Sequence, residues 1–183
     1  MSTAFSLIIP AYNEAKRLPP YLASIRVHLT AAIPDAHEVI VVDDGSTDGT
    51  REYVSRMAAE WPALRLVFHP QNQGKGAAVR TGMLAAVGEI RLFADADGAT
   101  PIAEEERLRA AIEAGADVAI GSRRIQAAGL TRRRHWFRGL VGWSFARFIR
   151  CLLPIPVRDT QCGFKMFRRA AAERLFALSK EDG

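Results

Sequence analysis

The strongest constraint on the fold is a regular alternation of short apolar runs with longer helix-like stretches up to about residue 122. The apolar runs occupy residues 5–9, 38–42, 64–68, 90–94 and 118–120. The helix-like stretches lie between them, at residues 18–32, 50–60, 76–86 and 102–114. Strands that alternate with helices of this length indicate βαβ units. The sequence therefore predicts an α/β fold with a mostly parallel sheet flanked by helices.

The composition is that of an ordinary globular protein. The chain has 183 residues, 49% hydrophobic and 25% charged, which suits one domain and excludes a disordered tail and a coiled coil. Its two cysteines, Cys151 and Cys162, are too few for a disulfide framework, so a reducing cytosol is expected. We expect no signal peptide, because residues 1–14 lack a basic segment and a cleavage site. We also expect no membrane span, because no run of about 20 apolar residues occurs.

The charge is unevenly distributed along the chain. Residues 123–169 contain eleven Arg and Lys165 but a single acid, Asp159, whereas the other positions hold 13 basic and 19 acidic residues. A strongly basic block joined to a mildly acidic body favours an anionic partner, such as phosphates, nucleic acid or an anionic membrane surface. A solvated, Arg-rich surface without a partner is the alternative.

Polar or charged loops follow each of the five apolar runs. They comprise residues 11–14, 43–46, 72–76, 95–97 and 121–123. In open parallel sheets, ligands bind outside the carboxyl ends of the strands. These loops are therefore expected to form one site that holds several carboxylates and two cations.

Asp95 and Asp97 follow the fourth apolar run. In an extended segment, residues i and i+2 point to the same side, so the two carboxylates could share one hard cation. Mg²⁺ or Mn²⁺ prefers oxygen ligands and commonly binds one or two carboxylates together with substrate phosphates. A phosphatase motif is not matched, because Ala99 stands where that pattern needs Thr or Val. The pair is predicted to bind a metal.

Asp43 and Asp44 follow the second apolar run and begin the sequence D-D-G-S-T-D-G-T. A calcium loop is excluded, because the twelfth position from Asp44 is Ser55 rather than a glutamate. Thr47 or Asp48 is expected to cap the helix that follows. Capping does not account for two acids at a strand end, and we expect Asp43 and Asp44 to accept hydrogen bonds from a base or ribose.

Lys75 lies between two glycines at the start of a helix-like stretch. The complete phosphate-binding pattern G-x-x-x-x-G-K-[ST] is absent, and the absence of G-x-G-x-x-G argues against a nicotinamide enzyme. Two interpretations remain open for Lys75. It binds a phosphate of the ligand, or it belongs to a loop that merely begins a helix.

Five aromatic residues are interspersed with arginines at positions 136–153. This mixture is typical of a helix at a lipid interface. The alternative is a core helix whose arginines extend outward to solvent.

Taken together, six motifs resemble those of family 2 glycosyltransferases, most closely the branch of dolichyl-phosphate or polyprenyl-phosphate β-glucosyltransferases. The motifs are P-A-Y-N-E (10–14), V-V-D-D-G-S-T-D (41–48), G-K-G-A-A-V-R (74–80), A-D-A-D-G-A-T-P (94–101), G-S-R (121–123) and R-D-T-Q-C-G-F-K-M-F (158–167). The ordered set covers nearly the whole chain and is more specific than any one of its members.

The resemblance implies an A-type glycosyltransferase fold, with a Rossmann-like sheet, in a single domain of residues 1–183. Residues 1–122 correspond to the nucleotide-sugar-binding half, and residues 123–183 to a basic part that faces the acceptor and the membrane. Family positions for base and ribose correspond to Pro10, Tyr12, Glu14, Val42 and Asp44. The metal and diphosphate motif corresponds to Asp95, Ala96 and Asp97, and the basic positions near the donor and lipid phosphates to Arg123, Arg138 and Lys165.

The implied activity is transfer of glucose from UDP-glucose to a dolichyl or polyprenyl phosphate by inversion, with Mg²⁺ or Mn²⁺, at the cytoplasmic face of a membrane. Asp95, Asp97, Arg123 and Arg138 are the expected catalytic residues. A GDP-mannose donor is the nearest alternative, although Ala99 replaces a glutamine common in mannose synthases. Transfer to a sugar hydroxyl would need a carboxylate such as Asp159 near the acceptor, and no nucleic-acid motif supports a nucleic-acid partner. Relatives usually continue beyond the point where this chain ends, so a shortened chain is expected.

Overall fold

The computed structural model describes residues 4–121 and 162–178. Within them, six strands form one sheet in the order β3-β2-β1-β4-β6-β5. The strands are β1 (Phe5–Ala11), β2 (His37–Asp44), β3 (Leu64–His69), β4 (Ile90–Ala94), β5 (Val118–Ile120) and β6 (Phe164–Arg168). The helices are α1 (Leu18–Ala32), α2 (Thr50–Glu60), α3 (Lys75–Ala85), the short 3₁₀ helix η1 (Ile102–Glu104), α4 (Glu105–Glu113) and α6 (Arg169–Leu178). The predicted α/β alternation is confirmed.

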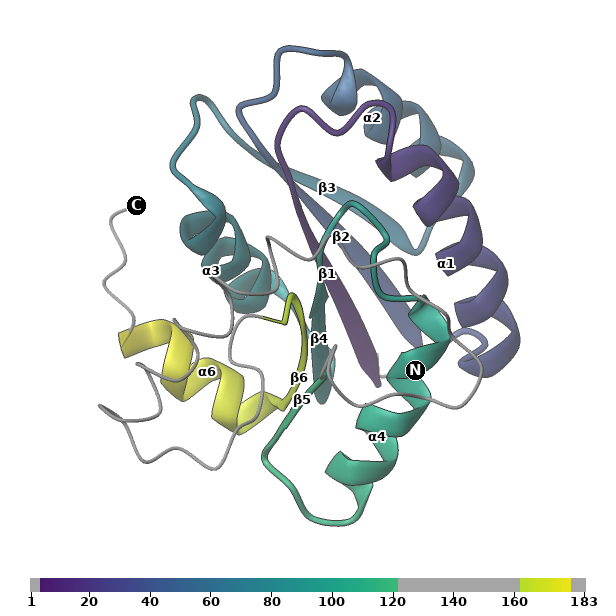
Figure 1. Cartoon of the computed structure of the whole chain (residues 1–183), viewed down its shortest axis with the longest axis vertical. Coiled ribbons are helices and arrows are strands. Elements are labelled where there is room, and N and C mark those ends of the chain that lie inside the picture. The colour runs from purple at the N-terminus through teal and green to yellow at the C-terminus, as the bar shows by residue number, and fades with distance from the viewer. Residues whose placement is uncertain (1–3, 122–161, 179–183) are drawn as a thin grey trace, which may run out of the picture. The chain divides into compact units, whose positions relative to one another are not determined.

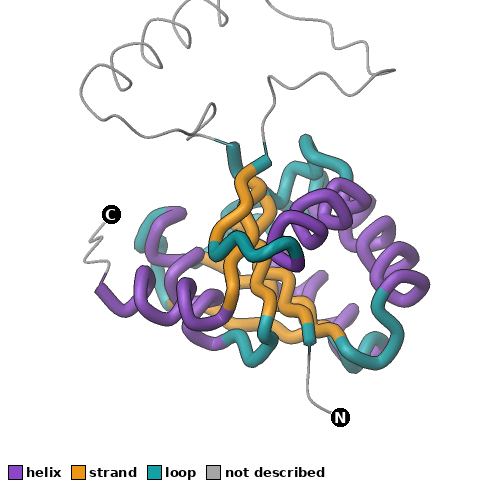
Figure 2. Tube along the Cα trace, turned by 90° about the horizontal axis from the view of Figure 1, so that it is seen from below, coloured by secondary structure: helices purple, strands orange, loops and turns teal. Residues whose placement is uncertain are grey.

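The chain divides into two compact units, residues 1–119 with 163–183, and residues 120–162. Most of the second unit lies outside the described residues. In the first unit, α1, α2 and α4 lie on one face of the sheet, and α3 and α6 lie on the other (Figure 1 and Figure 2). β1 is parallel to β2 and β4, and β2 to β3, so the loops that follow these strands emerge at one edge of the sheet.

β1 continues through Pro10 to Ala11, two residues beyond the predicted run. Proline has no N–H and is disfavoured in the interior of a sheet. Here the pairing of β1 with β4 extends only over residues 5–8, whereas the pairing with β2 continues to Ala11. Pro10 therefore lies where β1 has a strand neighbour on one side only, and β1 can deliver residues 10 and 11 to the edge of the sheet.

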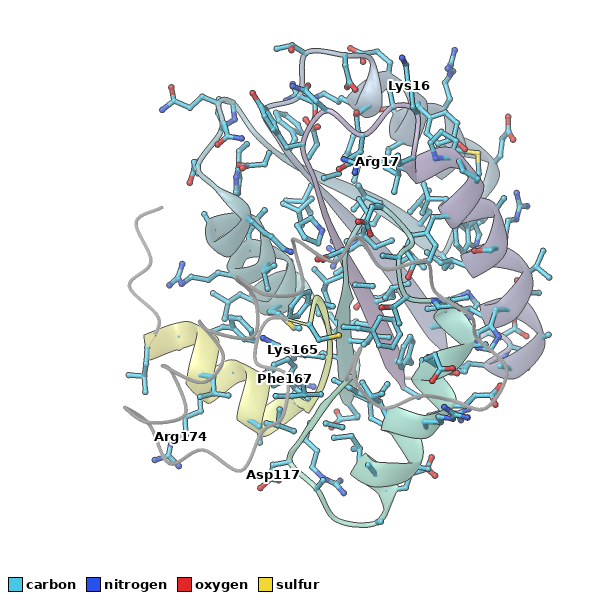
Figure 3. All side chains as sticks on the ribbon, in the orientation of Figure 1. Lys16, Arg17, Asp117, Lys165, Phe167 and Arg174 are labelled. Carbon is cyan, nitrogen blue, oxygen red and sulfur yellow. The ribbon has the colours of Figure 1, made fainter. Side chains whose placement is uncertain are left out.

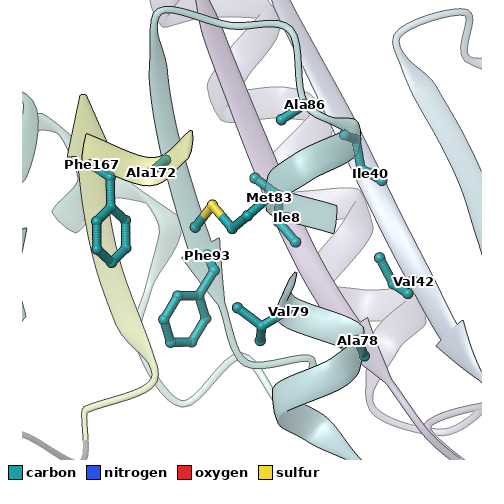
Figure 4. Close-up of a cluster of buried hydrophobic side chains, with 10 residues drawn as sticks. All are labelled: Ile8, Ile40, Val42, Ala78, Val79, Met83, Ala86, Phe93, Phe167 and Ala172. Atoms are coloured by element: carbon teal, nitrogen blue, oxygen red, sulfur yellow. The ribbon is translucent and has the colours of Figure 1, made fainter. Parts of the chain in front are cut away.

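A cluster of buried apolar side chains lies where the sheet packs against α3 and α6 (Figure 4). Its members are Ile8, Ile40, Val42, Ala78, Val79, Met83, Ala86, Phe93, Phe167 and Ala172. Burial of a large apolar side chain of this kind contributes about 1.5–3 kcal/mol relative to leaving it exposed. Gly82 permits a close approach, because a Cβ atom there would clash with the side chain of Ile8. This packing fixes the position of α3 and hence of its first residue, Lys75.

The alternation in the sequence did not predict β6. This strand runs antiparallel to β4, with Ala94 opposite Phe164 and Phe93 opposite Lys165, and the side chains of Phe164 and Met166 are fully buried. β6 and α6 come from the part of the chain that was expected to face the acceptor, yet they belong to the same compact unit as β1 to β4. The division of the domain at residue 122 stays a prediction.

Candidate functional site

A pocket of about 410 Å³ lies at the carboxyl ends of β1, β2 and β4 and at the start of α3. It is lined by Pro10, Ala11, Tyr12, Glu14, Arg17, Asp44, Asn72, Gly74, Lys75, Ala78, Asp95, Ala96 and Asp97. Residues from four of the five polar loops are thus brought together, as the parallel sheet predicts. Of the candidate site residues that the structure describes, Val42, Asp43 and Lys165 do not line this pocket.

The loops after β1 and β2 are joined by hydrogen bonds between side chains and backbone. The backbone N–H of Asn13 donates to Oγ of Ser46 at 3.0 Å, and the N–H of Thr47 donates to Oδ1 of Asn13 at 2.9 Å. The N–H of Ala15 donates to Oδ2 of Asp48 at 3.0 Å. The two loops therefore form one wall of the pocket. The hydrogen bonds fix the backbone at Asn13 and Ala15, next to Tyr12 and Glu14.

The expected cap of α2 takes a different form. The N-cap residue is Gly49, whose φ of 89° lies in the left-handed region, and no side chain caps it. Asp48 instead accepts a hydrogen bond from the N–H of Thr50 at 3.1 Å as well as the one from Ala15. Slight burial acts to raise the pKa of the Asp48 carboxyl, but hydrogen bonds from Thr50 and Ala15 outweigh it and lower the pKa. Asp48 therefore joins the loops and also binds the N–H of the first residue of α2, although Gly49 occupies the N-cap position.

Glu14 offers a carboxylate oxygen to the pocket wall. Its Oε1 lies 2.5 Å from NH2 of Arg17, while its Oε2 is buried and has no hydrogen-bond partner among the residues that the structure describes. Arg17 lies just before α1, at the carboxyl end of the parallel strands (Figure 3). Sequence analysis did not single out Arg17, although its spacing of three from Glu14 allows this pairing.

Asp44 is almost fully buried and accepts three hydrogen bonds. Its Oδ1 lies 2.7 Å from Nδ1 of His69 and 2.9 Å from the backbone nitrogen of Gln73, and its Oδ2 accepts from the N–H of Gly74 at 2.9 Å. Nε2 of His69 lies 3.0 Å from Oγ1 of Thr81 in α3. Asp44 therefore holds the loop that precedes α3, and its predicted contact with base or ribose stays a prediction.

Val42 and Asp43 are buried and do not line the pocket. Val42 belongs to the buried cluster beneath α3. Asp43 is fully buried, and its Oδ2 lies 2.9 Å from the guanidinium of Arg51, which also donates to the backbone oxygen of His69. The side chain of Arg51 in turn covers the ring of Phe68. A nucleotide contact of Val42 or Asp43 is not tested by this placement and stays a prediction.

Asp95 and Asp97 both line the pocket, but through a turn rather than the extended segment that the sequence analysis assumed. The N–H of Gly98 approaches the backbone oxygen of Asp95 at 3.4 Å, and Gly98 has a φ of 62°. The ring of Tyr21 in α1 packs beneath Gly98, and its hydroxyl donates to the oxygen of Thr100 at 3.3 Å. Burial and then the negative charges of Asp97 and Asp95 raise the pKa of Tyr21. Tyr21 therefore supports the turn as a neutral phenol.

The surroundings of Asp95 fit a divalent cation. Its carboxylate lies against Gly163, where any Cβ atom would overlap it, and its backbone N–H donates to the oxygen of Gly163 at 3.0 Å. Lys75 places its Nζ 2.6 Å from Oδ1 of Asp95. Asp95 and Asp97 bring two carboxylates to the lining of one pocket, and carboxylate oxygens are the donors that Mg²⁺ and Mn²⁺ prefer. Sequence analysis did not identify Gly163 as part of the site.

The remaining candidates lie elsewhere. Lys165 is in β6, with its Nζ 5.7 Å from the ring centroid of Phe93, and Figure 3 shows it well apart from Arg17. Arg123, Arg138 and the aromatic segment 136–153 lie outside the described residues. Among the helices that the structure describes, none has both the length and the apolar character needed to cross a membrane.

Comparison with known proteins identifies the family. A sequence profile of glycosyl transferase family 2 matches residues 6–176, from β1 into α6. The chain belongs to this family. The matched range includes all six motifs of the sequence.

Similar family members include two curated dolichyl-phosphate beta-glucosyltransferases. The one from Drosophila melanogaster is 40% identical over 189 residues, which cover 96% of this chain and 57% of that protein. ALG5C of Trichomonas vaginalis is 39% identical over 180 residues, which cover 93% of this chain and 53% of that protein. The chain thus spans little more than half the length of the curated relatives it matches.

Solved structures confirm the A-type glycosyltransferase fold. The mannosyltransferase PcManGT from Pyrobaculum calidifontis, solved in complex with GDP-Man and Mn²⁺, aligns with a TM-score of 0.65 at 27% identity. That alignment covers 93% of this chain and 46% of PcManGT. S. aureus TarS 1-349 aligns with a TM-score of 0.62 at 25% identity, over 91% of this chain and 47% of TarS.

Proposed function

We propose that this chain is the catalytic part of an inverting glycosyltransferase that moves glucose from UDP-glucose to a dolichyl or polyprenyl phosphate. The observation that supports this most directly is the pocket that gathers Asp44, Lys75, Asp95 and Asp97 at one edge of the sheet. The relatives that are 39% and 40% identical are named dolichyl-phosphate beta-glucosyltransferases, which supports the acceptor and the sugar.

The donor nucleotide occupies the wall formed by the loops after β1 and β2. Tyr12 is half exposed there and offers a ring for stacking against a base. Glu14 offers its buried, unpaired Oε2 as an acceptor for a base N–H or a ribose hydroxyl. An unpaired buried carboxylate oxygen is costly, and a bound donor group removes that cost. The diphosphate lies toward Lys75 and the first N–H groups of α3, which have no helical partners.

Asp95 and Asp97 would hold Mg²⁺ or Mn²⁺, and the bound cation would supply positive charge to stabilise the departing nucleoside diphosphate. Tyr21 and Gly163 keep the two carboxylates in place, the first beneath Gly98 and the second against Asp95. Lys75 adds a second positive charge beside these carboxylates, with its Nζ 2.6 Å from Oδ1 of Asp95. The protein thereby neutralises a leaving group that carries several negative charges.

The acceptor phosphate reacts without a strong general base, because it is already an anion near neutral pH. One of its oxygens forms a bond to the anomeric carbon of the sugar while the bond from that carbon to the diphosphate oxygen breaks. The leaving nucleoside diphosphate keeps the electron pair, and in-line attack on an α-linked donor gives a β-linked product. Arg123, Arg138 and the basic block at 123–169 offset the repulsion between the two phosphate groups.

The basic and aromatic block also supports a peripheral position on an anionic membrane surface, on the cytoplasmic side where nucleotide sugars are available. Arginines attract anionic lipid headgroups, and Trp and Phe favour the boundary between headgroups and acyl chains. The lipid phosphate would then reach the pocket from the membrane. The sequence contains no recognised nucleic-acid-binding motif, so we do not propose a nucleic-acid partner for the basic block.

GDP-mannose is the second candidate donor. It is favoured by the likeness to PcManGT, which was solved with GDP-Man and Mn²⁺. Transfer to a sugar hydroxyl would need a carboxylate near the acceptor, and Asp159, the residue expected in that role, lies outside the described residues.

Transfer of radiolabelled sugar to a polyprenyl phosphate tests the proposal, with UDP-glucose and GDP-mannose assayed in parallel in the presence of Mg²⁺. We expect label in the lipid phase from UDP-glucose alone. Label from GDP-mannose alone would replace the donor assignment and keep the reaction class. Failure to bind either nucleotide sugar, measured by calorimetry with Mn²⁺, would overturn the proposed function.

A further inference from the structure

Lys75 and Asp95 form an ion pair across the floor of the pocket. The distance from Nζ of Lys75 to Oδ1 of Asp95 is 2.6 Å, and the two side chains are 59% and 36% exposed. Both residues line the pocket, although they come from different loops, one before α3 and the other after β4. The ammonium therefore contacts a carboxylate that is proposed to bind the divalent cation.

The position of Lys75 in α3 is unfavourable for helix stability. It is the first residue of the helix, where the partial positive charge of the helix dipole repels a cation. No acidic residue lies in the first turn, and the N-cap residue Gly74 supplies no side-chain cap. A lysine at this place therefore raises the local positive potential, which favours binding of an anion.

The backbone at Lys75 is fixed, whereas its side chain is largely exposed and makes one described ion pair, with Asp95. Asp44 accepts hydrogen bonds from the N–H groups of Gln73 and Gly74, the two residues immediately before Lys75. The packing of Ala78 and Val79 in the buried cluster fixes the first turn of α3 from below. A long, mostly exposed lysine side chain on a fixed backbone can reach different anions within a few ångströms without movement of the loop.

We propose that Lys75 alternates between two anions, Asp95 in the donor-free protein and the diphosphate of the nucleotide sugar in the loaded protein. This inference rests on the proposed function and assigns Lys75 a part in it. In the donor-free protein the ammonium reduces the repulsion between Asp95 and Asp97. When a divalent cation binds these carboxylates, the ammonium leaves Asp95 and contacts a donor phosphate, a charge-assisted interaction.

Removal of the Lys75 ammonium should change the affinity for metal and the affinity for donor in opposite directions. An exposed ion pair is weak, so the ammonium competes with the metal only modestly, and its removal should tighten metal binding in the absence of donor. The same removal takes away a cation from the diphosphate and should weaken donor binding. Metal and donor each break the ion pair between Lys75 and Asp95, so Lys75 also couples their binding. Bound metal should therefore raise the affinity for the donor, and bound donor should raise the affinity for the metal. A residue with only a structural role would not shift the two affinities in opposite directions.

The test compares Lys75→Gln with Lys16→Gln in the full chain. Lys16 is exposed on the same side of the molecule, beside Arg17 and outside the pocket lining, so its substitution removes one charge without altering the ion pair (Figure 3). Binding of Mn²⁺ alone is measured by electron paramagnetic resonance of the free ion. Binding of UDP-glucose is measured by calorimetry at saturating Mn²⁺.

We expect Lys75→Gln to bind Mn²⁺ alone roughly two- to fivefold more tightly and UDP-glucose about tenfold or more weakly. Lys16→Gln should change neither affinity by more than about twofold. Unchanged or weaker Mn²⁺ binding by Lys75→Gln, with normal binding by the unaltered chain, would overturn this inference and leave the proposed function intact. Absence of both Mn²⁺ and UDP-glucose binding in the unaltered chain would overturn the proposed function, and the inference with it.

Discussion

Two pairs of aspartates at strand ends look alike in the sequence and differ in the structure. Asp43 and Asp44 end β2 and are both buried, and basic side chains or backbone N–H groups contact them. Asp95 and Asp97 follow β4 and are partly or largely exposed in the pocket. The contacts of Asp95 are with Lys75 and Gly163, and the one side-chain hydrogen bond described for Asp97 comes from the N–H of Ala99.

The difference shows how to separate acids that build a site from acids that serve it. A buried carboxylate costs free energy unless donors surround it, so a saturated one such as Asp44 must organise its neighbours. A carboxylate that is exposed in a pocket retains free lone pairs for a ligand and contributes little to folding. Asp44 positions the loop that leads into Lys75. Asp95 and Asp97 are available to a cation.

Substitution of Asp97 by Asn should produce the largest effect on binding and almost none on folding. The amide keeps the shape of the side chain and removes the charge that a divalent cation needs. We expect Mn²⁺-dependent binding of UDP-glucose to weaken by about a hundredfold or more. The free energy of unfolding, from urea titration, should change by less than about 0.5 kcal/mol, because the side chain is exposed. Unchanged donor affinity in excess Mn²⁺ would contradict the metal assignment.

The same substitution at Asp44 should show the reverse pattern. An Asn side chain must place an NH₂ group against a donor, either the N–H of Gly74 or those of His69 and Gln73. We expect the free energy of unfolding to fall by about 2–3 kcal/mol, because charge-assisted hydrogen bonds to a buried carboxylate are lost. Urea titration measures this loss, and Asp97→Asn is the matched control. If Asp44→Asn were as stable as the unaltered chain, the contrast between the two pairs would be wrong.

The sequence predicted the β1 to β5 strands and their helices closely, because alternation of apolar runs and helical stretches is a local property. It did not predict β6, whose pairing partner β4 lies some 70 residues earlier and whose apolar residues are embedded in a basic segment. Gly163 was missed for the same reason, because it contacts Asp95 although the two residues are far apart in the sequence. His69 was missed because it lies between the predicted strand at 64–68 and the predicted loop at 72–76, although β3 extends to His69 and register places it opposite Asp44.

Tyr21 packs beneath Gly98, in the turn that holds Asp95 and Asp97, and its substitution should have the smallest effect on stability near neutral pH. Its hydroxyl donates to the oxygen of Thr100, so Tyr21→Phe should lower the free energy of unfolding by about 0.5–1 kcal/mol at pH 8. Burial, and then the charges of Asp97 and Asp95, raise the pKa of Tyr21 in the folded protein. The unfolded chain, with a tyrosine pKa of about 10, therefore loses this proton first as pH rises.

The stability that depends on this proton is fully present below pH of about 10 and declines as pH rises from there toward the folded-state pKa. Urea titrations of the two proteins at pH 8, 9.5 and 10.5 should show their difference shrinking as pH rises, because Tyr21→Phe has no phenol to ionise. Parallel curves would mean that the ring is not held in its neutral form. A second comparison in the Asp97→Asn background should reduce the effect, since Asp97 is the larger of the two carboxylate contributions to the shift. A smaller pH-dependent difference in that background would show that the charge of Asp97 raises the pKa of the Tyr21 phenol.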